Sequence, residues 1–331
     1  MRIFHFILVI FCGLVASCGS ADTCFPREET LTQELMPLQG VTYPVRVEVK
    51  HPFLIVQNMK RADSLFHIYD LTNYELKSVF GVMGQGPNEY VAPWLFHTQL
   101  PDILIGDVDK NFVYRFGINE EGLPVFRDAI QLGYLDYGVA DAAFINDSLY
   151  VMDAKHIAPS LYLLTLQDEL PKKTRQYRNP DLINYNYYAD PDIGKAYANE
   201  SRIALCYEYK KQIDFMDTDL NLIKRVKFDF AHPANIDGPD VKVSYVYGYF
   251  GKRYLYALFF GTSWNEHRAN SLRGTFLEVF DLDGNPVVRY RLDGLRPVYF
   301  AVDEETFTLY GAGDDGEPED YLVVYKLNGL F

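Results

Sequence analysis

FLIVQ at residues 53–57, followed after a polar connection by FHIYD at residues 66–70, is the pattern that decides the fold. β-Branched and aromatic residues dominate both segments, as is typical of buried strands. The first segment has five further counterparts along the chain, at intervals of about 50 residues. The six copies begin at Leu54, Leu104, Leu149, Ile203, Leu255 and Leu309.

The second segment recurs on the same period. Its six copies reach Tyr69, Phe116, Leu164, Met216, Phe280 and Tyr325, and the one longer interval contains an insertion at residues 261–274. A repeat of about 40–50 residues made of strands is the signature of β-propeller blades, each with four antiparallel strands. A β-sandwich or two stacked β domains would also contain many short strands, but neither requires a regular period. The sequence therefore predicts an all-β fold, a six-bladed β-propeller over residues 31–331.

The two ends of the repeat array fit a closed ring. The last repeat has segments for three strands, at residues 298–302, 307–309 and 321–327, and no fourth segment before Phe331. The segment Leu31–Leu38 lies upstream of the first blade and has no partner there. We predict that this N-terminal segment is the outer strand of the last blade, because closure covers strand edges that would otherwise be exposed.

Composition and charge disfavour several classes of protein. Hydrophobic residues make up 48% of the 331-residue chain and charged residues 23%, which favours a globular fold over a disordered one. The 45 Asp and Glu outnumber the 31 Lys and Arg, and the net charge of −14 argues against nucleic acid as a partner. The sequence has no His-Glu-x-x-His or Gly-x-Ser-x-Gly motif and no Cys/His spacing typical of a metal site. We therefore predict no catalytic residue, no metal and no cofactor.

The N-terminal segment has the features of an export signal. Arg2 is followed by an apolar run of about a dozen residues, shorter than the ~20 that a membrane-spanning helix needs. The sequence LVASCG at residues 14–19 resembles the bacterial lipobox, which implies cleavage before Cys18 and lipidation of that cysteine. An ordinary signal peptide with an incidental cysteine is the alternative. We expect a signal peptide at residues 1–17, a tether at 18–30, and lipid anchoring in the bacterial cell envelope, at the outer membrane and facing the periplasm.

Two further cysteines lie downstream of this signal. Cys24 and Cys206 could form one disulfide in an oxidising periplasm. Cys24 lies in the expected tether and Cys206 in an apolar run, so we expect two unpaired thiols instead, with Cys206 buried and inert.

The stretch GVMGQGPNEYVAP at residues 81–93 resembles a known motif. It is similar to the linker between NHL-type blades and, more closely, to the Gly-x-Gly-Pro-x-Glu-aromatic motif of six-bladed propeller lipoproteins of Bacteroides-like bacteria, often called TolB-like. Residues 254–261 and 276–286 also resemble the fifth blade of that family. The resemblance implies the fold and the lipoprotein class, and it supplies no catalytic residues. The interblade motif consists of Gly81, Gly84, Gln85, Gly86, Pro87, Glu89, Tyr90 and Pro93.

A glycine-rich run of this kind can also bind phosphate. That use requires a strand before the run and a helix N-terminus after it. Pro87 follows the glycines here, and no helical periodicity comes next. We expect instead a tight crossing between blades, in which glycine supplies a positive φ and Glu89 accepts backbone N–H bonds.

The connections of a propeller alternate between two rims. With the strands of each blade named A to D from the axis outward, the A–B and C–D turns form a short-turn rim. The B–C and D–A connections form a long-loop rim, which holds every long segment and is where binding groups are expected. The candidate binding residues on this rim are Lys110, Lys155, His156, Lys210, Tyr187, Tyr188, Trp264, His267 and Arg268.

Both kinds of candidate side chain on this rim allow two interpretations. The cations could form an anion-attracting ring, or each could pair with a nearby acid at the surface. The tyrosines could stack on sugar rings, or they could pack their own long connection against the propeller.

Together these features predict a membrane-anchored, non-catalytic binding or scaffold module. Its partner would be a protein, peptide or glycan of the cell envelope, contacted through the long-loop rim. The alternative is a propeller hydrolase or lyase that acts on a sugar or lactone at the mouth of the central channel. That chemistry needs clustered carboxylates with Asn or His, and the candidate acids are Glu48, Asp107, Asp141 and Asp303.

Overall fold

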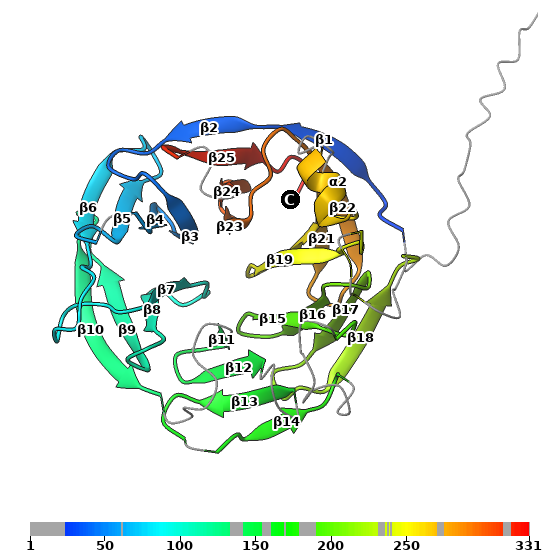
Figure 1. The fold of residues 1–331 in the computed structure, drawn as a ribbon, viewed down its shortest axis with the longest axis horizontal. Coiled ribbons are helices and arrows are strands. Elements are labelled where there is room, and N and C mark those ends of the chain that lie inside the picture. The colour runs from blue at the N-terminus through cyan, green and yellow to red at the C-terminus, as the bar shows by residue number, and fades with distance from the viewer. Residues whose placement is uncertain are drawn as a thin grey trace, which may run out of the picture.

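The computed structural model describes residues 24–60, 62–132, 142–153, 160–168, 170–178, 190–230, 236, 238, 240–269, 275–313 and 319–330. Within them, the strands form six sheets arranged as a ring around a central axis (Figure 1). Five of these sheets have four strands and one has a fifth. The predicted six-bladed β-propeller is confirmed.

Five blades are each built around four consecutive strands, and the sixth takes three from the C-terminal part of the chain. Blade 1 contains β3 (Pro44–Lys50), β4 (Phe53–Asn58), β5 (Phe66–Asp70) and β6 (Leu76–Phe80). Blade 2 contains β7 (Pro93–Phe96), β8 (Ile103–Asp107), β9 (Phe112–Ile118) and β10 (Pro124–Gln131). Blade 3 contains β11 (Ala142–Phe144), β12 (Leu149–Asp153), β13 (Leu161–Thr165) and β14 (Lys173–Arg175). Blade 4 contains β15 (Gly194–Ala198), β16 (Ile203–Tyr207), β17 (Gln212–Met216) and β18 (Leu222–Lys227). Blade 5 contains β19 (Tyr245–Phe250), β20 (Tyr254–Phe259), β21 (Thr275–Asp281) and β22 (Pro286–Asp293). Blade 6 contains β23 (Tyr299–Asp303), β24 (Thr308–Ala312) and β25 (Tyr321–Lys326).

The N-terminal part of the chain closes the ring. Strand β2 (Glu34–Pro37) pairs antiparallel with β25 and is the outer strand of blade 6, as predicted. Strand β1 (Glu28–Thr32) pairs instead with β22, in parallel, as a fifth strand of blade 5. The expected single strand is therefore two strands on two blades, and pairing begins inside the segment expected to be a tether. Both strands follow the outer circumference of the ring (Figure 1).

Aromatic rings fill the spaces between neighbouring blades, which accounts for the high Tyr and Phe content. Phe80 lies 5.3 Å from Phe116 between blades 1 and 2, measured between ring centroids. Tyr247 lies 5.2 Å from Phe300 between blades 5 and 6. Buried tyrosines direct their hydroxyls to backbone carbonyls or to carboxylates, as when Tyr69 donates to Gln39 and Tyr245 to Glu278, both at 2.8 Å. The rings thus supply apolar area without leaving a polar atom unsatisfied.

The turns of the short-turn rim repeat one device. An Asp or Asn at the end of the third strand accepts backbone N–H groups within the turn. Asp217 accepts from Asn221 and Asp281 from Asn285, both at 2.8 Å. Asn119 accepts from Leu123 at 2.8 Å in the corresponding turn of blade 2. These side chains keep the C–D turns short.

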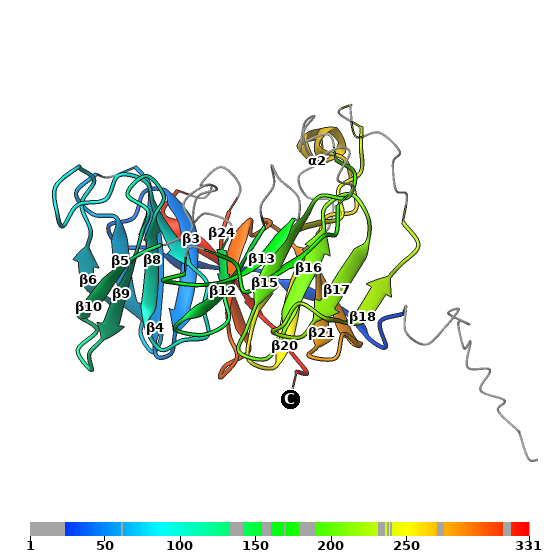
Figure 2. The ribbon, with the colours of Figure 1, turned by 90° about the horizontal axis from the view of Figure 1, so that it is seen from below.

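The long connections lie on the opposite rim. The insertion of blade 5 contains a helix, α2 (Trp264–Ala269), which projects from this rim on the side away from the C-terminus (Figure 2). The insertion was predicted, but its helix was not. No helix among the described residues is long and apolar enough to span a membrane.

The two cysteines of the described chain are not paired with each other. Cys206 is a free thiol, and its burial on β16 raises its pKa well above the usual value, as expected for an inert core residue. Cys24 is disulfide-bonded, so the expectation that it is an unpaired thiol is wrong.

Candidate functional site

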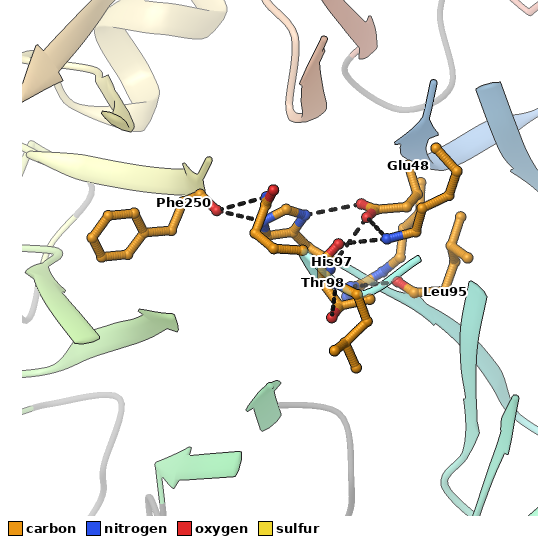
Figure 3. Close-up of polar contacts among 9 residues, drawn as sticks. Glu48, Leu95, His97, Thr98 and Phe250 are labelled. Carbon is orange, nitrogen blue, oxygen red and sulfur yellow. Dashed lines mark hydrogen bonds and ion pairs between the residues drawn. The ribbon is translucent and has the colours of Figure 1, made fainter. Parts of the chain in front are cut away.

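His97 crosses the axial channel. It follows strand β7 of blade 2, and its Nε2 lies 2.9 Å from the carbonyl oxygen of Phe250 on blade 5, on the far side of the ring (Figure 3). Gln99 donates to the same carbonyl at 2.9 Å. The His97 ring also packs on Tyr249, with ring centroids 3.8 Å apart. These side chains form a partition that divides the channel into two compartments.

Glu48 anchors this partition to blade 1. Its side chain is fully buried on β3 and lies 2.9 Å from both His97 Nδ1 and Lys50 Nζ (Figure 3). The backbone N–H of Thr98 donates to it at 3.2 Å. Burial by itself raises the pKa of Glu48, but Lys50 and His97 outweigh that effect and hold the pKa below its usual value. Glu48 is therefore a buried charge that is paired on two sides.

On one side of the partition the channel forms a small pit. It encloses about 40 Å³. Arg46, Ala142 and Tyr247 lie in the first half of their inner strands, on the side of the long-loop rim. Phe96 and Ala198 instead end their strands, and His97 follows β7. Its walls are Arg46, Phe96, His97, Ala142, Ala143, Lys195, Ala196, Tyr197, Ala198 and Tyr247. The described residues that line the pit include no Asp or Glu.

On the other side of the partition, a depression of about 740 Å³ opens at the short-turn rim. Lys50, Gln99 and Lys252 line it, together with apolar residues from the turns of blades 1 and 2. A smaller adjoining hollow contains His51, whose Nδ1 lies 3.2 Å from the buried carboxylate of Asp303. We expected a site on the long-loop rim only, and this second depression was not foreseen.

Arg46 is the most distinctive side chain of the pit. Its guanidinium lies 4.2 Å from the centroid of the Trp94 ring and 5.0 Å from that of Tyr299. Its hydrogen bond to the carbonyl of Leu95 is long, at 3.5 Å. Its buried Nε has no hydrogen-bond partner. Two aromatic rings thus fix the position of a guanidinium whose donors are largely unused.

The candidate catalytic acids do not come together. Asp107 accepts backbone N–H groups of the interblade motif, from Val91 at 2.8 Å and from Ala92 at 3.2 Å. Asp303 is bound by Thr306 and His51 at the short-turn rim, whereas Glu48 lies within the partition. Asp141 is outside the described residues. Over the described part of the chain, no three His, Cys, Asp or Glu side chains are grouped so that they could hold a metal ion.

The interblade motif forms the expected tight crossing. Glu89 accepts the backbone N–H of Gly86 at 2.8 Å, as predicted, and a Cβ atom at Gly84 would overlap its carboxylate. Gly81 has a φ of 82°, which glycine adopts without strain. Tyr90 is buried, whereas Gln85 and Pro87 are exposed. Pro93 begins β7 and its carbonyl accepts from the buried Gln57 at 2.8 Å.

The described cations of the long-loop rim are engaged within the fold. Lys110 donates to the carbonyls of Gly86 and Glu89, both at 2.7 Å, and so fastens the interblade motif. Lys210 pairs with Asp192 at 2.6 Å. For Lys210 the geometry agrees with the pairing interpretation, whereas Lys110 binds backbone carbonyls and not an acid. Trp264 is 40% exposed on α2 and packs on Phe260.

The other predicted rim residues cannot be placed in this way. Lys155, His156, Tyr187 and Tyr188 lie outside the described residues. His267 and Arg268 belong to α2, but their side chains are outside the described set.

Sequence reasoning named Glu48 as a channel residue but missed the other side chains at the axis. Arg46, His97 and Gln99 come from two blades, and their partners Phe250 and Tyr299 come from two others. The strand periodicity places Arg46 and Glu48 on the same face of an inner strand, because they are two residues apart. It gives no indication of which side chains meet across the channel.

Comparison with known proteins bears on the fold alone. No protein-family model matches the chain, and no curated protein matches it. Among solved structures, the chain is similar to the crystal structure of a DUF4221 family member from Bacteroides vulgatus, with a TM-score of 0.53 and 16% sequence identity. The similarity covers 89% of this chain and 95% of that one. It supports a six-bladed propeller of the same overall shape, and the TolB-like or NHL-like type stays a prediction.

Proposed function

We propose that this chain is a lipid-anchored propeller of the bacterial cell envelope that binds a protein, peptide or glycan at its long-loop rim without chemical turnover. The observation that carries the proposal is that part of the pit lining, including Arg46 and Ala142, lies on the side of the channel from which helix α2 of the long-loop rim projects (Figure 2). A rigid ring with long loops around a recess is the usual arrangement of a binding surface.

The buried acids of the channel support binding over catalysis. Glu48 is held by Lys50 and His97, and Asp107 is occupied by backbone donors. Such groups stabilise the ring, because their oxygens are already bound by partners within the fold. The alternative hydrolase or lyase has one observation in its favour, the pairing of the partly exposed His51 with Asp303 beside the short-turn depression.

If the ligand binds at the long-loop rim, a substitution on that rim should weaken binding and a substitution on the opposite rim should not. We expect the purified protein of residues 24–331 to retain ligands from an array of envelope peptides and glycans. The Trp264→Ala substitution should lower the affinity for the retained ligand about tenfold. His51→Ala, on the opposite rim, should leave binding unchanged. Affinities measured by calorimetry, with the mass of the recovered ligand, check this. A ligand recovered with an altered mass, or binding lost only in His51→Ala, contradicts the proposal and favours the alternative.

The anchor predicts a change of location. We expect the full-length protein to sediment with membranes and Cys18→Ser to become soluble, because stable anchoring rests on the acyl chains attached at this position. The ten residues 18–27 before β1 extend at most about 35 Å, so the anchor would hold the propeller close to the membrane. Cys24→Ser is the matched control and should stay in the membrane fraction. Mass spectrometry of the N-terminal peptide completes the test. The proposal requires that the disulfide of Cys24 is absent from the mature lipoprotein, so a Cys18–Cys24 disulfide in place of a lipid contradicts it.

A further inference from the structure

We propose that the axial pit binds the carboxylate of a small acidic ligand, and that Arg46 is the residue that recognises it. This inference rests on the proposed binding function of the long-loop rim and names the chemistry of its ligand. It is carried by three observations: an arginine without an ionic partner, a pit without a described carboxylate, and a volume that suits one small planar group.

Arg46 has no ionic partner among the described residues. Its neighbour on the same face of β3, Glu48, is already bound by Lys50 and His97. Within the described part of the chain, the guanidinium has one bonded acceptor, the carbonyl of Leu95 at 3.5 Å, and its Nε atom is buried with no acceptor. Unused donors on a buried nitrogen are costly, so the site favours a ligand that accepts hydrogen bonds.

The fixed position of Arg46 suits one particular geometry. The rings of Trp94 and Tyr299 hold the guanidinium from two sides, with centroids 4.2 and 5.0 Å away. A planar guanidinium presents parallel N–H donors that match the two oxygens of a carboxylate. Because the aromatic rings restrict the side chain before any ligand arrives, little rotamer entropy is lost on binding.

The environment of the pit favours an anion in an otherwise acidic protein. The net charge of the chain is −14, yet the described residues that line the pit include Arg46, Lys195 and His97 and no acid. The partition closes the floor, because His97 and Gln99 both bond to Phe250 across the channel. The walls are otherwise alanine and aromatic side chains. An anion inside the pit would therefore lie close to the guanidinium of Arg46, with no described carboxylate in the lining to repel it.

The size of the pit restricts the ligand. About 40 Å³ is room for a few water molecules, or for a carboxylate with its adjoining carbon, and not for a whole sugar ring. The rest of the ligand would therefore extend toward the rim and its long connections. An acidic sugar and the C-terminus of a peptide both present such a group, and the experiment separates these two sources.

The test compares acids with their neutral amides. The probes are glucuronate with glucuronamide, and N-acetyl-alanine with N-acetyl-alaninamide, titrated by calorimetry into residues 24–331. We expect at least one acid to bind at least about tenfold more tightly than its amide. Preference for glucuronate indicates an acidic sugar, and preference for N-acetyl-alanine indicates a peptide terminus.

Variants of Arg46 assign the contact. Arg46→Gln should weaken binding of the preferred acid at least about tenfold. The affinity of Arg46→Lys should lie between those of the wild type and Arg46→Gln, because lysine keeps the charge but loses the paired donors. Arg202→Gln, on the short-turn rim, is the matched control and should bind as the wild type does. Thermal unfolding of each variant verifies that it is folded.

Three results overturn the inference: neither acid binds, acid and amide bind equally, or Arg46→Gln binds like the wild type. If a neutral peptide or glycan from the array still binds in any of these cases, only the inference about the carboxylate fails. If the array also retains nothing, the proposed binding function fails with it.

Discussion

Replacing Glu48 with Gln is expected to lower the free energy of unfolding by about 3–5 kcal/mol, the usual result of removing one partner from a buried ion pair. The substitution keeps the shape of the side chain but leaves Lys50 and His97 in the channel without their counter-charge. Urea unfolding at pH 7, followed by tryptophan fluorescence, measures the change. Glu305→Gln, in an exposed turn of the short-turn rim, is the control and should change stability by less than about 0.5 kcal/mol.

The same variant has an expected pH dependence. The pKa of Glu48 is lowered in the folded protein, so its charge stabilises the fold at any pH above the unfolded value of about 4.3. That contribution is lost as the pH falls through the lower pKa of the folded state. The difference between wild type and Glu48→Gln should therefore be constant from pH 6 to 7 and shrink below about pH 4. A difference that grows as the pH falls would show that Glu48 is not a stabilising charge.

Removing the two N-terminal strands should lower the stability of the propeller and also change its oligomeric state. A chain that starts at Gln39 lacks β1 and β2, which leaves the outer edge of β25 without a partner. It also lacks Leu31, Met36 and Leu38, which are all buried. Each such side chain contributes about 1.5–3 kcal/mol, and their sum is comparable to the whole stability of many domains. We expect this chain to unfold at much lower urea concentration and to form oligomers through its free edge.

Light scattering after gel filtration and urea unfolding check this prediction, with residues 24–331 as the reference. A synthetic peptide of residues 24–38, added in excess, should restore a monomeric and more stable propeller. A truncated chain that is monomeric and unfolds at the same urea concentration as the reference would show that the two strands do not close the ring.

The period of the sequence was enough to predict the fold, because the two central strands of each blade recur at a similar spacing along the chain. The two segments that pair in blade 1, with Leu54 opposite Tyr69, have counterparts in every blade. The missing strand of the last blade pointed directly to the N-terminal segment. The parallel pairing of β1 with β22 was not predicted, because blade 5 already has four strands and nothing in EETLT marks a fifth.

The candidate site was predictable only in its general position. The lengths of the connections can be read from the spacing of strands, so the long-loop rim could be defined from sequence, and its role in binding stays a prediction. Lys110 binds the carbonyl of Gly86 and Lys210 pairs with Asp192. The sequence did not identify either of these partners. The meeting of Arg46 with Trp94 and Tyr299 depends on how blades 1, 2 and 6 are rotated about the axis. Repeat spacing does not contain that information.

The pairing of β2 with β25 also sets the order in which the molecule can fold. Glu34 lies opposite Val324, so two of the most distant parts of the described chain must meet before the last blade is whole. Contacts between such distant segments form slowly, because a long loop must first be closed. Blades 1 to 4 can form from local hairpins, whereas Glu34–Pro37 stays unpaired until β25 is present. The final step of maturation is therefore the arrival of the C-terminal hairpin at a segment that was made first.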